Sequence, residues 1–99
     1  MPLESEFAAE LWRWPAKDAW YFVTLPLDLA DDIRSRAEPA GFGSVKVHAE
    51  IGSTRWSTSV FPDTSSGSYV LPVKAAVRRA EALDEGSEAM VRLRIELEG

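Results

Sequence analysis

Two stretches of the sequence match at a separation of 46 residues, and this internal repeat constrains the fold more than any other feature. Leu25-Pro26-Leu27 and Leu71-Pro72-Val73 differ by 71 − 25 = 46 positions. The same offset of 46 places VKVHAEI, residues 45–51, on VRLRIEL, residues 91–97. Both segments alternate apolar and polar side chains, which is typical of a strand with one buried face. Each half of the chain therefore predicts the order strand, Leu-Pro, helix, alternating strand.

From two such halves we predict a single α+β domain in which most of the regular secondary structure is β-strand. In a pseudo-twofold arrangement the halves, residues about 6–52 and about 53–99, form a small closed β-barrel with two short helices at its ends or sides. Closure removes the exposed strand edges that a short sheet otherwise has to protect. A chain of 99 residues is near the usual size of a single domain, so we expect one core.

The remaining segments predict further strands. Alternation over Glu6–Trp14 and the β-branched and aromatic run Trp20–Leu25 predict a hairpin, with its turn in residues 15–19. The segment Arg55–Pro62 predicts another strand, and residues 63–68, DTSSGS, predict a loop.

Two helices are predicted. The first has Asp28 as its N-cap and ends at Pro39 and Gly41. The second spans about Lys74–Leu83 and is followed by a turn over residues 84–89, DEGSEA.

Composition excludes several classes of chemistry. The chain has no cysteine, which excludes disulfides, thiolate metal sites and a cysteine nucleophile. A net charge of −5 and a pI near 4.8 disfavour nucleic acid and anionic membranes as partners. The sequence shows no signal-peptide pattern at its start and no apolar run long enough to span a membrane. We therefore expect a cytoplasmic protein.

The chain carries a specific set of motifs. They are a Gly-Phe-Gly entry at Gly41–Gly43, the segment Trp56-x-Thr58-Ser59-x-Phe61-Pro62, the run Leu71–Lys74, Val77-Arg78 and Gly86. The opening FAAELWRW and WYFVTLP also fit. On these residues the chain resembles the bacterial family known as domain of unknown function nineteen-oh-five, over nearly its whole length.

The resemblance implies a double-split β-barrel, similar in architecture to proteins of the AbrB and MazE type. In those proteins two chains each supply half a barrel, whereas the repeat here supplies both halves, so the resemblance implies a monomer. Residues 87–90 depart from the family pattern, in which an acidic residue and an alternating strand follow Gly86. The family implies no settled biochemical activity.

Residues that often carry catalysis or bind metals are sparse. His48 is the single histidine, and its place on the polar side of an alternating segment indicates a solvated strand face. Abundant serines leave a Ser-His-Asp triad open, although no nucleophile elbow is present. The aspartates between positions 28 and 32 suit helix capping better than metal binding. We therefore expect no metal and no cofactor.

The strongest candidate site surrounds the second predicted helix. Lys74 at its amino terminus and Arg78 one turn later cost about half a kcal/mol through the helix dipole and like-charge repulsion. A bound anion would reverse both penalties. The predicted anion site comprises Lys74, Arg78, Trp56, Ser57, Ser59 and Tyr69. The alternative is that the two cations pair with acids of the protein itself, such as Asp63, Glu81 and Asp84.

Four tryptophans are many for so short a chain. As core or helix-packing residues, Trp12, Trp14, Trp20 and Trp56 need no function. Trp12 and Trp14 share a strand face with Glu10, however, so an exposed aromatic pair there would mark an interaction surface.

Three functions stay open. A non-enzymatic binding module for a small anionic ligand or peptide ranks first. A nucleic-acid-binding, antitoxin-like regulator ranks second by analogy with the AbrB fold, although the negative charge counts against it. A small enzyme with Ser57 or Ser59 as nucleophile and Lys74 as base ranks third, because it requires a desolvated lysine beside the hydroxyl.

Overall fold

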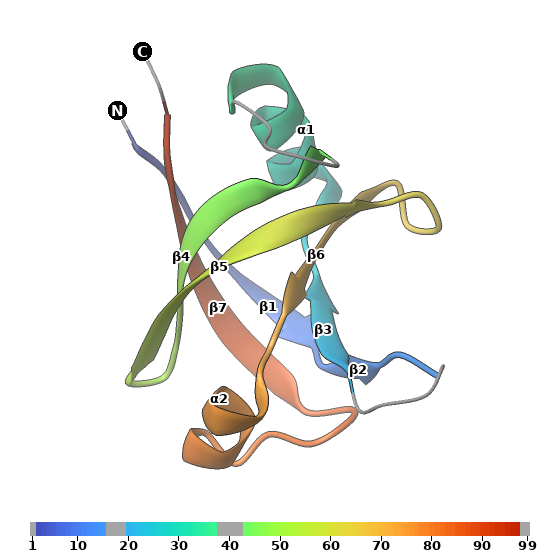
Figure 1. The fold of residues 1–99 in the computed structure, drawn as a ribbon, viewed down its shortest axis with the longest axis vertical. Helices are drawn as coiled ribbons and strands as arrows, with labels where there is room; N and C mark the ends of the chain where they lie inside the picture. The colour runs from blue at the N-terminus through green and yellow to red at the C-terminus, as the bar shows by residue number, and fades with distance from the viewer. Residues whose placement is uncertain (1, 16–19, 38–42, 98–99) are drawn as a thin grey trace.

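The chain folds as short strands interrupted by two helices. The computed structural model describes residues 2–15, 20–37 and 43–97. Figure 1 shows a strongly curved layer of strands, with α1 near one end and α2 near the other. The elements are β1 (Pro2–Glu10), β2 (Trp12–Arg13), β3 (Tyr21–Thr24), α1 (Leu27–Arg36), β4 (Val45–Ile51), β5 (Thr54–Asp63), β6 (Ser68–Pro72), α2 (Ala75–Ala80) and β7 (Glu88–Glu96).

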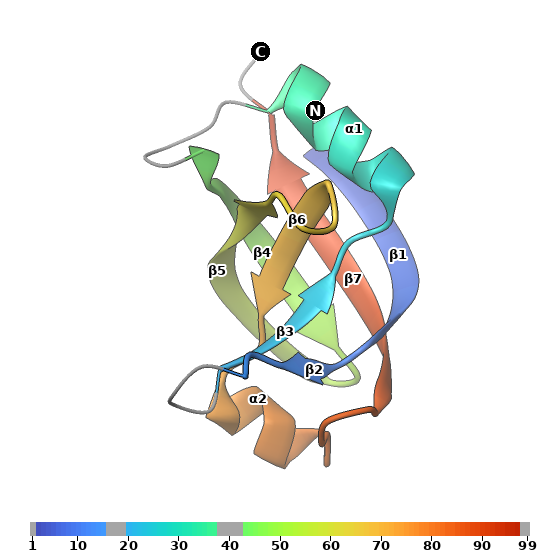
Figure 2. The ribbon, with the colours of Figure 1, turned by 90° about the vertical axis from the view of Figure 1, so that its right-hand side faces the viewer.

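The seven strands form one antiparallel sheet in the order β1-β7-β4-β5-β6-β3-β2. The sheet curls into a half-barrel, and Figure 2 shows the helices at its opposite ends. The strands at the two ends of this order, β1 and β2, are separated in sequence by Leu11 alone. The N–H of Leu11 donates to the Ser87 carbonyl, and its carbonyl accepts from the Gly86 N–H, both at 2.8 Å. One continuous stretch of chain therefore supplies both edge strands.

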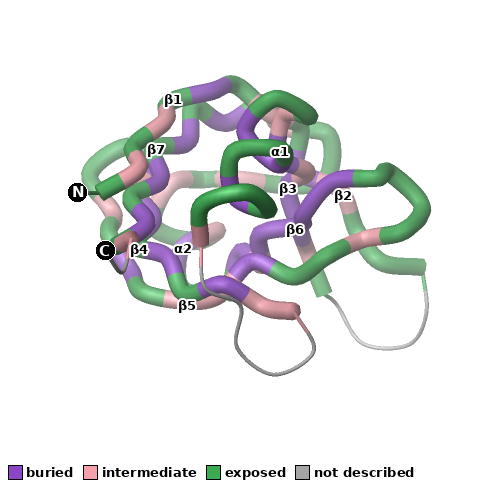
Figure 3. Tube along the Cα trace, turned by 90° about the horizontal axis from the view of Figure 1, so that it is seen from above, coloured by how far each residue is buried: buried purple, intermediate pink, exposed green. Residues whose placement is uncertain are grey.

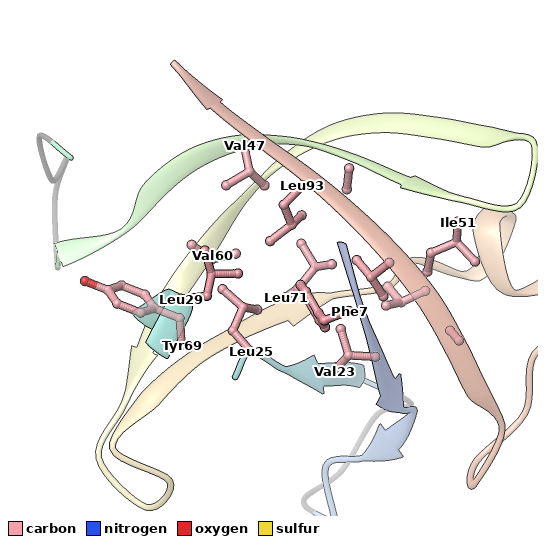
Figure 4. Packing of buried hydrophobic residues seen from close by; sticks show 14 of the residues in the cluster. Phe7, Val23, Leu25, Leu29, Val47, Ile51, Val60, Tyr69, Leu71 and Leu93 are labelled. Carbon is pink, nitrogen blue, oxygen red and sulfur yellow. The ribbon is translucent and has the colours of Figure 1, made fainter. Parts of the chain in front are cut away.

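Inward-facing side chains fill the half-barrel. Buried and exposed residues alternate along β4 and β7, as Figure 3 shows by colour. Leu71 and Leu93 lie within the cluster of buried side chains in Figure 4. Burial of a side chain of this size contributes about 1.5–3 kcal/mol relative to exposure. Leu29 and Ile33 of α1 and Val77 of α2 join the same core, so both helices pack on it.

The prediction of a mostly-β α+β protein with two helices is confirmed. The strand predicted over residues 45–51 has the same bounds as β4. The strand predicted over Arg55–Pro62 extends by one residue at each end as β5. The predicted hairpin forms in part, because its first strand breaks at Leu11: β1 pairs with β7, and only β2 pairs with β3. Residues 16–19 of the predicted turn lie outside the described residues.

The first helix starts earlier than predicted. α1 begins at Leu27 with Pro26 as its N-cap, so the prediction of Asp28 as the N-cap is wrong. The proline ring fixes φ, here at −58°, close to the helical value and so favours a helix start. Asp28 lies in the first turn, where its carboxylate interacts favourably with the helix dipole. The predicted stop at Pro39 and Gly41 lies outside the described residues.

The second helix is shorter than predicted and ends in a Schellman motif. α2 spans Ala75–Ala80, not Lys74–Leu83. The N–H of Leu83 donates to the Arg78 carbonyl at 2.8 Å, and Ala82 adopts the left-handed conformation with φ of 53°. Arg78 therefore lies in the last turn, where a cation is favourable, so the prediction that it stands at the unfavourable end of the helix is wrong.

The last strand also starts earlier than predicted. β7 begins at Glu88, so the turn predicted over residues 84–89 is confined to its first part. The N–H of Asp84 donates to the Ser87 hydroxyl, and the N–H of Ser87 donates to the Asp84 carbonyl, both at 2.9 Å. Ala89 is buried and pairs with Ala9 of β1, which lengthens the strand in the region that departs from the family pattern.

Candidate functional site

The residues of the predicted anion site do not gather at one place. Trp56 packs into the core with 9% of its surface exposed, whereas its neighbours Ser57 and Ser59 lie on the outer face of β5. Tyr69 is buried near the start of β6, and Lys74 follows the opposite end of that strand. The structure therefore does not arrange these side chains around one ligand.

Arg78 has partners within the protein. Its Nε donates to the Val73 carbonyl at 3.2 Å, and its guanidinium carbon lies 3.9 Å from the centroid of the Tyr21 ring. A cation over an aromatic face contributes about 0.5–1 kcal/mol at an exposed site. Glu81, one of the acids that the alternative reading offered to the two cations, accepts a 2.6 Å hydrogen bond from Thr54 instead. These contacts give Arg78 a structural role in joining α2 to β3.

The single histidine lies on the outer face of β4, as predicted. His48 Nδ1 and the Ser57 hydroxyl are 3.1 Å apart, and both side chains are exposed. Catalysis by a serine and a histidine requires a third group that orients the histidine. No carboxylate hydrogen-bonds to His48 among the described residues. The pair is therefore a surface hydrogen bond and does not support a serine nucleophile.

A row of alternating charges crosses the outer face of β1, β7, β4 and β5. The guanidinium of Arg92 lies 2.7 Å from Glu6 and 3.4 Å from Glu50, and Glu50 lies 3.3 Å from Arg55. The hydrogen bond and the charge of Glu6 raise the pKa of Arg92. An open hollow of about 880 Å³ lies over this row. The four charges of this row compensate one another, and Glu4, which also lines the hollow, adds a carboxylate with no ion pair among the described residues.

Aromatic side chains cover the outer face of the other half of the sheet. Trp12 pairs with Phe22 across β2 and β3, and a 2.8 Å bond from the Trp14 N–H to the Trp20 carbonyl continues the ladder. Neighbouring ring centroids in this group are 5.1–6.4 Å apart. Trp14 is 46% exposed and Trp20 is 57% exposed. We term Trp12, Trp14, Trp20 and Phe22 the aromatic face.

The aromatic face is separate from the core. Phe22 and Val70 are buried but do not belong to the cluster of side chains that forms the core. The indole N–H of Trp12 donates to the Thr24 hydroxyl at 2.9 Å, which gives the indole donor its partner on this surface. Val70 pairs with Thr24 on one side and on the other with Phe61, which is 42% exposed. A second apolar layer thus extends outside the sheet from β2 to β5.

Lys74 lies at the end of this aromatic face. The Val73 N–H donates to the Tyr21 carbonyl at 2.9 Å, which continues the β3–β6 ladder beyond Pro72. The next step in that register places Lys74 opposite Trp20, on the outward-facing side. Lys74 is exposed, and its ammonium makes no hydrogen bond or ion pair within the described part of the chain. The observed site therefore joins one cation of the predicted anion site to the predicted surface of Trp12 and Trp14.

Two members of the aromatic face, Trp20 and Phe22, were not predicted as site residues. Their spacing by two residues was a sequence signal, because it puts both rings on one side of a strand. Whether this is also the side that carries Trp12 and Trp14 depends on the register of the hairpin. Alternation within each strand does not specify that register.

The described residues contain no group of three or more acidic, histidine or cysteine side chains that suits a metal ion. Among the described helices, none has the length and apolar character needed to cross a membrane. No curated protein matches the sequence. A family model described as domain of unknown function (DUF1905) matches residues 7–93, which is 93 − 7 + 1 = 87 of the 99 residues. This match confirms the resemblance drawn from the motifs, and the chain belongs to the DUF1905 family.

Proposed function

We propose that this protein is a non-enzymatic binding module whose ligand lies on the aromatic face. The observation that carries the proposal is the pair of exposed indoles, Trp14 and Trp20, on a sheet surface outside the core. Contiguous exposed aromatic rings often mark binding sites, because burying them on association contributes strongly to affinity. Phe22 contacts the rings of Trp12, Trp14 and Trp20, and this packing orders the surface before a ligand arrives.

The geometry favours a different arrangement for an anionic ligand from the one that the sequence suggests. Arg78 is engaged with Tyr21 and Val73, so it has less capacity to bind a ligand. Lys74 makes no such contact and stands beside the aromatic face. A ligand that uses this cation would therefore also contact the indoles.

The two other functions gain no support from the geometry. Nucleic-acid binding needs a basic surface. In the row of charges on the outer face of the sheet, the arginines alternate with Glu6 and Glu50, so this surface is not basic. A serine–lysine enzyme needs Lys74 beside a hydroxyl. Ser57 instead hydrogen-bonds to His48, on a part of β5 that is not paired with β6.

We also propose that the half-barrel is a closed double-split barrel built from two related halves. Thr24 pairs with Val70 and His48 pairs with Arg94, so that 70 − 24 = 46 and 94 − 48 = 46. A residue of one repeat meets its own counterpart across an antiparallel pair only where a twofold axis passes between the strands. The sequence offset of 46 thus recurs in two strand pairs, which supports the duplication. The continuous stretch that forms β1 and β2 supports closure within one chain.

A thermal-shift screen tests the binding module. Wild type and Trp14→Ala/Trp20→Ala are compared against phosphates, nucleotides, aromatic and aliphatic carboxylates, and short peptides. The matched control is Met90→Ala, which removes a 54% exposed apolar side chain from β7. A ligand that binds only the folded state raises the melting temperature. We expect one compound class to stabilise wild type and Met90→Ala but not the double variant. Equal stabilisation of all three proteins, or none of wild type, would contradict the proposal.

A further inference from the structure

We infer that the aromatic face binds a planar aromatic ring bearing an anionic group, with the ring on Trp14 and Trp20 and the anion at Lys74. This assignment rests on the proposed function and adds the chemical class of the ligand. Its basis is the strand register, which places Trp14 opposite Trp20 and Trp20 opposite Lys74 on three neighbouring chain segments.

The indoles supply an apolar surface that is suited to a flat ligand. The ring of Trp20 lies nearly parallel to that of Phe22, at an interplanar angle of 21°, and the ring of Trp14 meets Phe22 edge-on at 65°. Both exposed indoles thus pack against Phe22, while much of their area stays in water. A planar ring gains both stacking and apolar burial on such a surface.

Lys74 supplies an unpaired positive charge beside these rings. Arg34, Arg55, Arg92 and Arg94 are each paired with a carboxylate at 3.3 Å or less. Lys74 has no such partner among the described residues. Its backbone is extended, with φ of −69° and ψ of 162°, so the outward alternation of β6 continues to this residue. The charge therefore stands at the end of the stacking surface.

Ring and charge are needed together. The net charge of −5 repels anions at long range, and a single exposed lysine binds an anion weakly. An anion without a ring therefore gains too little at Lys74 to stay bound. A positively charged ring would meet repulsion from the same ammonium. A ring with a carboxylate or a phosphate satisfies both parts of the surface.

The experiment varies the ring and the charge separately. One series of probes is naphthoate, naphthalenemethanol and acetate, and the other is adenosine monophosphate, adenosine and inorganic phosphate. Binding is followed by NMR of the tryptophan indole N–H groups, with Trp56 of the core as an internal reference. The variants are Lys74→Ala, Lys74→Arg and the control Lys46→Ala, which removes an exposed lysine from β4.

We expect at least one aromatic anion to shift the signals of Trp14 and Trp20 and to leave the Trp56 signal in place. Lys74→Ala weakens this binding about three- to tenfold, while Lys74→Arg and Lys46→Ala preserve it. The neutral ring binds wild type about as weakly as the anionic ring binds Lys74→Ala. Acetate and inorganic phosphate cause no shift. Comparison of the two series distinguishes a carboxylate from a phosphate as the charged group.

Different outcomes overturn this ligand class and the proposed function. If neutral and anionic rings bind wild type equally and Lys74→Ala changes neither, the ligand class is overturned while the binding module stands. If the Trp14 and Trp20 signals move with protein concentration and with no probe, the face is a contact between two copies and the ligand class is overturned. If no probe has an effect and the thermal-shift screen is also blank, both are overturned.

Discussion

The Thr54 hydroxyl donates a 2.6 Å hydrogen bond to the carboxylate of Glu81, and this bond joins the β4–β5 hairpin to the end of α2. Thr54 is the first residue of β5, and Glu81 is the C-cap of α2. A helix of six residues is too short to persist alone, so α2 depends on tertiary contacts of this kind and on the burial of Val77.

A double-mutant cycle measures this link. We expect Thr54→Val and Glu81→Ala each to lower the free energy of unfolding in urea by about 1 kcal/mol, because each leaves one partner without its hydrogen bond. The double variant should lose less than the sum, with a coupling energy of about 1 kcal/mol. Strictly additive losses would mean that the bond contributes nothing to stability.

Gly52→Ala should destabilise the protein more than Gly67→Ala. Both glycines have positive φ, 59° and 73°, so a side chain at either position costs about 1–2 kcal/mol of backbone strain. A Cβ at Gly52 would also overlap the carboxylate of Glu81, whereas a Cβ at Gly67 meets nothing within 4 Å. The difference between the two urea midpoints therefore reports displacement of Glu81. Equal midpoints would show that Glu81 moves aside at no cost.

Ala82→Gly should stabilise the protein. Ala82 occupies the left-handed position that follows α2, with φ of 53°, where glycine avoids a penalty of about 1 kcal/mol. The control is Ala76→Gly within the helix, which should cost about 1 kcal/mol. Calorimetric melting temperatures should thus move in opposite directions. A loss of stability in Ala82→Gly would argue that α2 does not end in the Schellman motif.

Arg78→Met should lower the free energy of unfolding by about 1 kcal/mol in the absence of any ligand. The substitution keeps an apolar stem but removes both the cation over Tyr21 and the donor to Val73. Arg78→Lys should recover part of the loss, because an ammonium keeps the charge but not the planar group. Arg79→Met, at an exposed neighbour, serves as the control and should change little. Equal losses at both positions would contradict a specific role for Arg78.

The strands were predictable from the sequence where one face meets the core and the other meets water. The bounds of β4 were predicted correctly because its first five residues, VKVHA, alternate between valine or alanine and a polar residue. β7 started earlier than predicted because pairing with β1 recruits Glu88 and Ala89, and a strand partner far away in sequence leaves no local signal. The end of α2 was missed for a different reason. The residue in the left-handed position is Ala82, and a sequence rule looks for glycine there.

Only part of the aromatic face and of its link to Lys74 was predictable from the sequence. Alternation predicts that Trp12 and Trp14 share one strand face, but the position of Trp20 beside them depends on the register of the hairpin. Lys74 was selected for an unfavourable helix position, whereas its place beside Trp20 follows from the pairing of β3 with β6. Register between strands is a tertiary property, so a single sequence can suggest the members of such a site without showing which of them meet.

The continuity of β1 and β2 has a consequence for biosynthesis. Among the strands of this sheet β1 leaves the ribosome first, yet its partner β7 is made after all the others, with Pro2 paired to Glu96. Until β7 is made, the nascent chain therefore carries a strand whose apolar side, including Phe7, lacks its partner strand. β2 can meet β3 much earlier, because only the hairpin separates them. Docking of β7 between β1 and β4 is thus the event that ends exposure of the nascent strand.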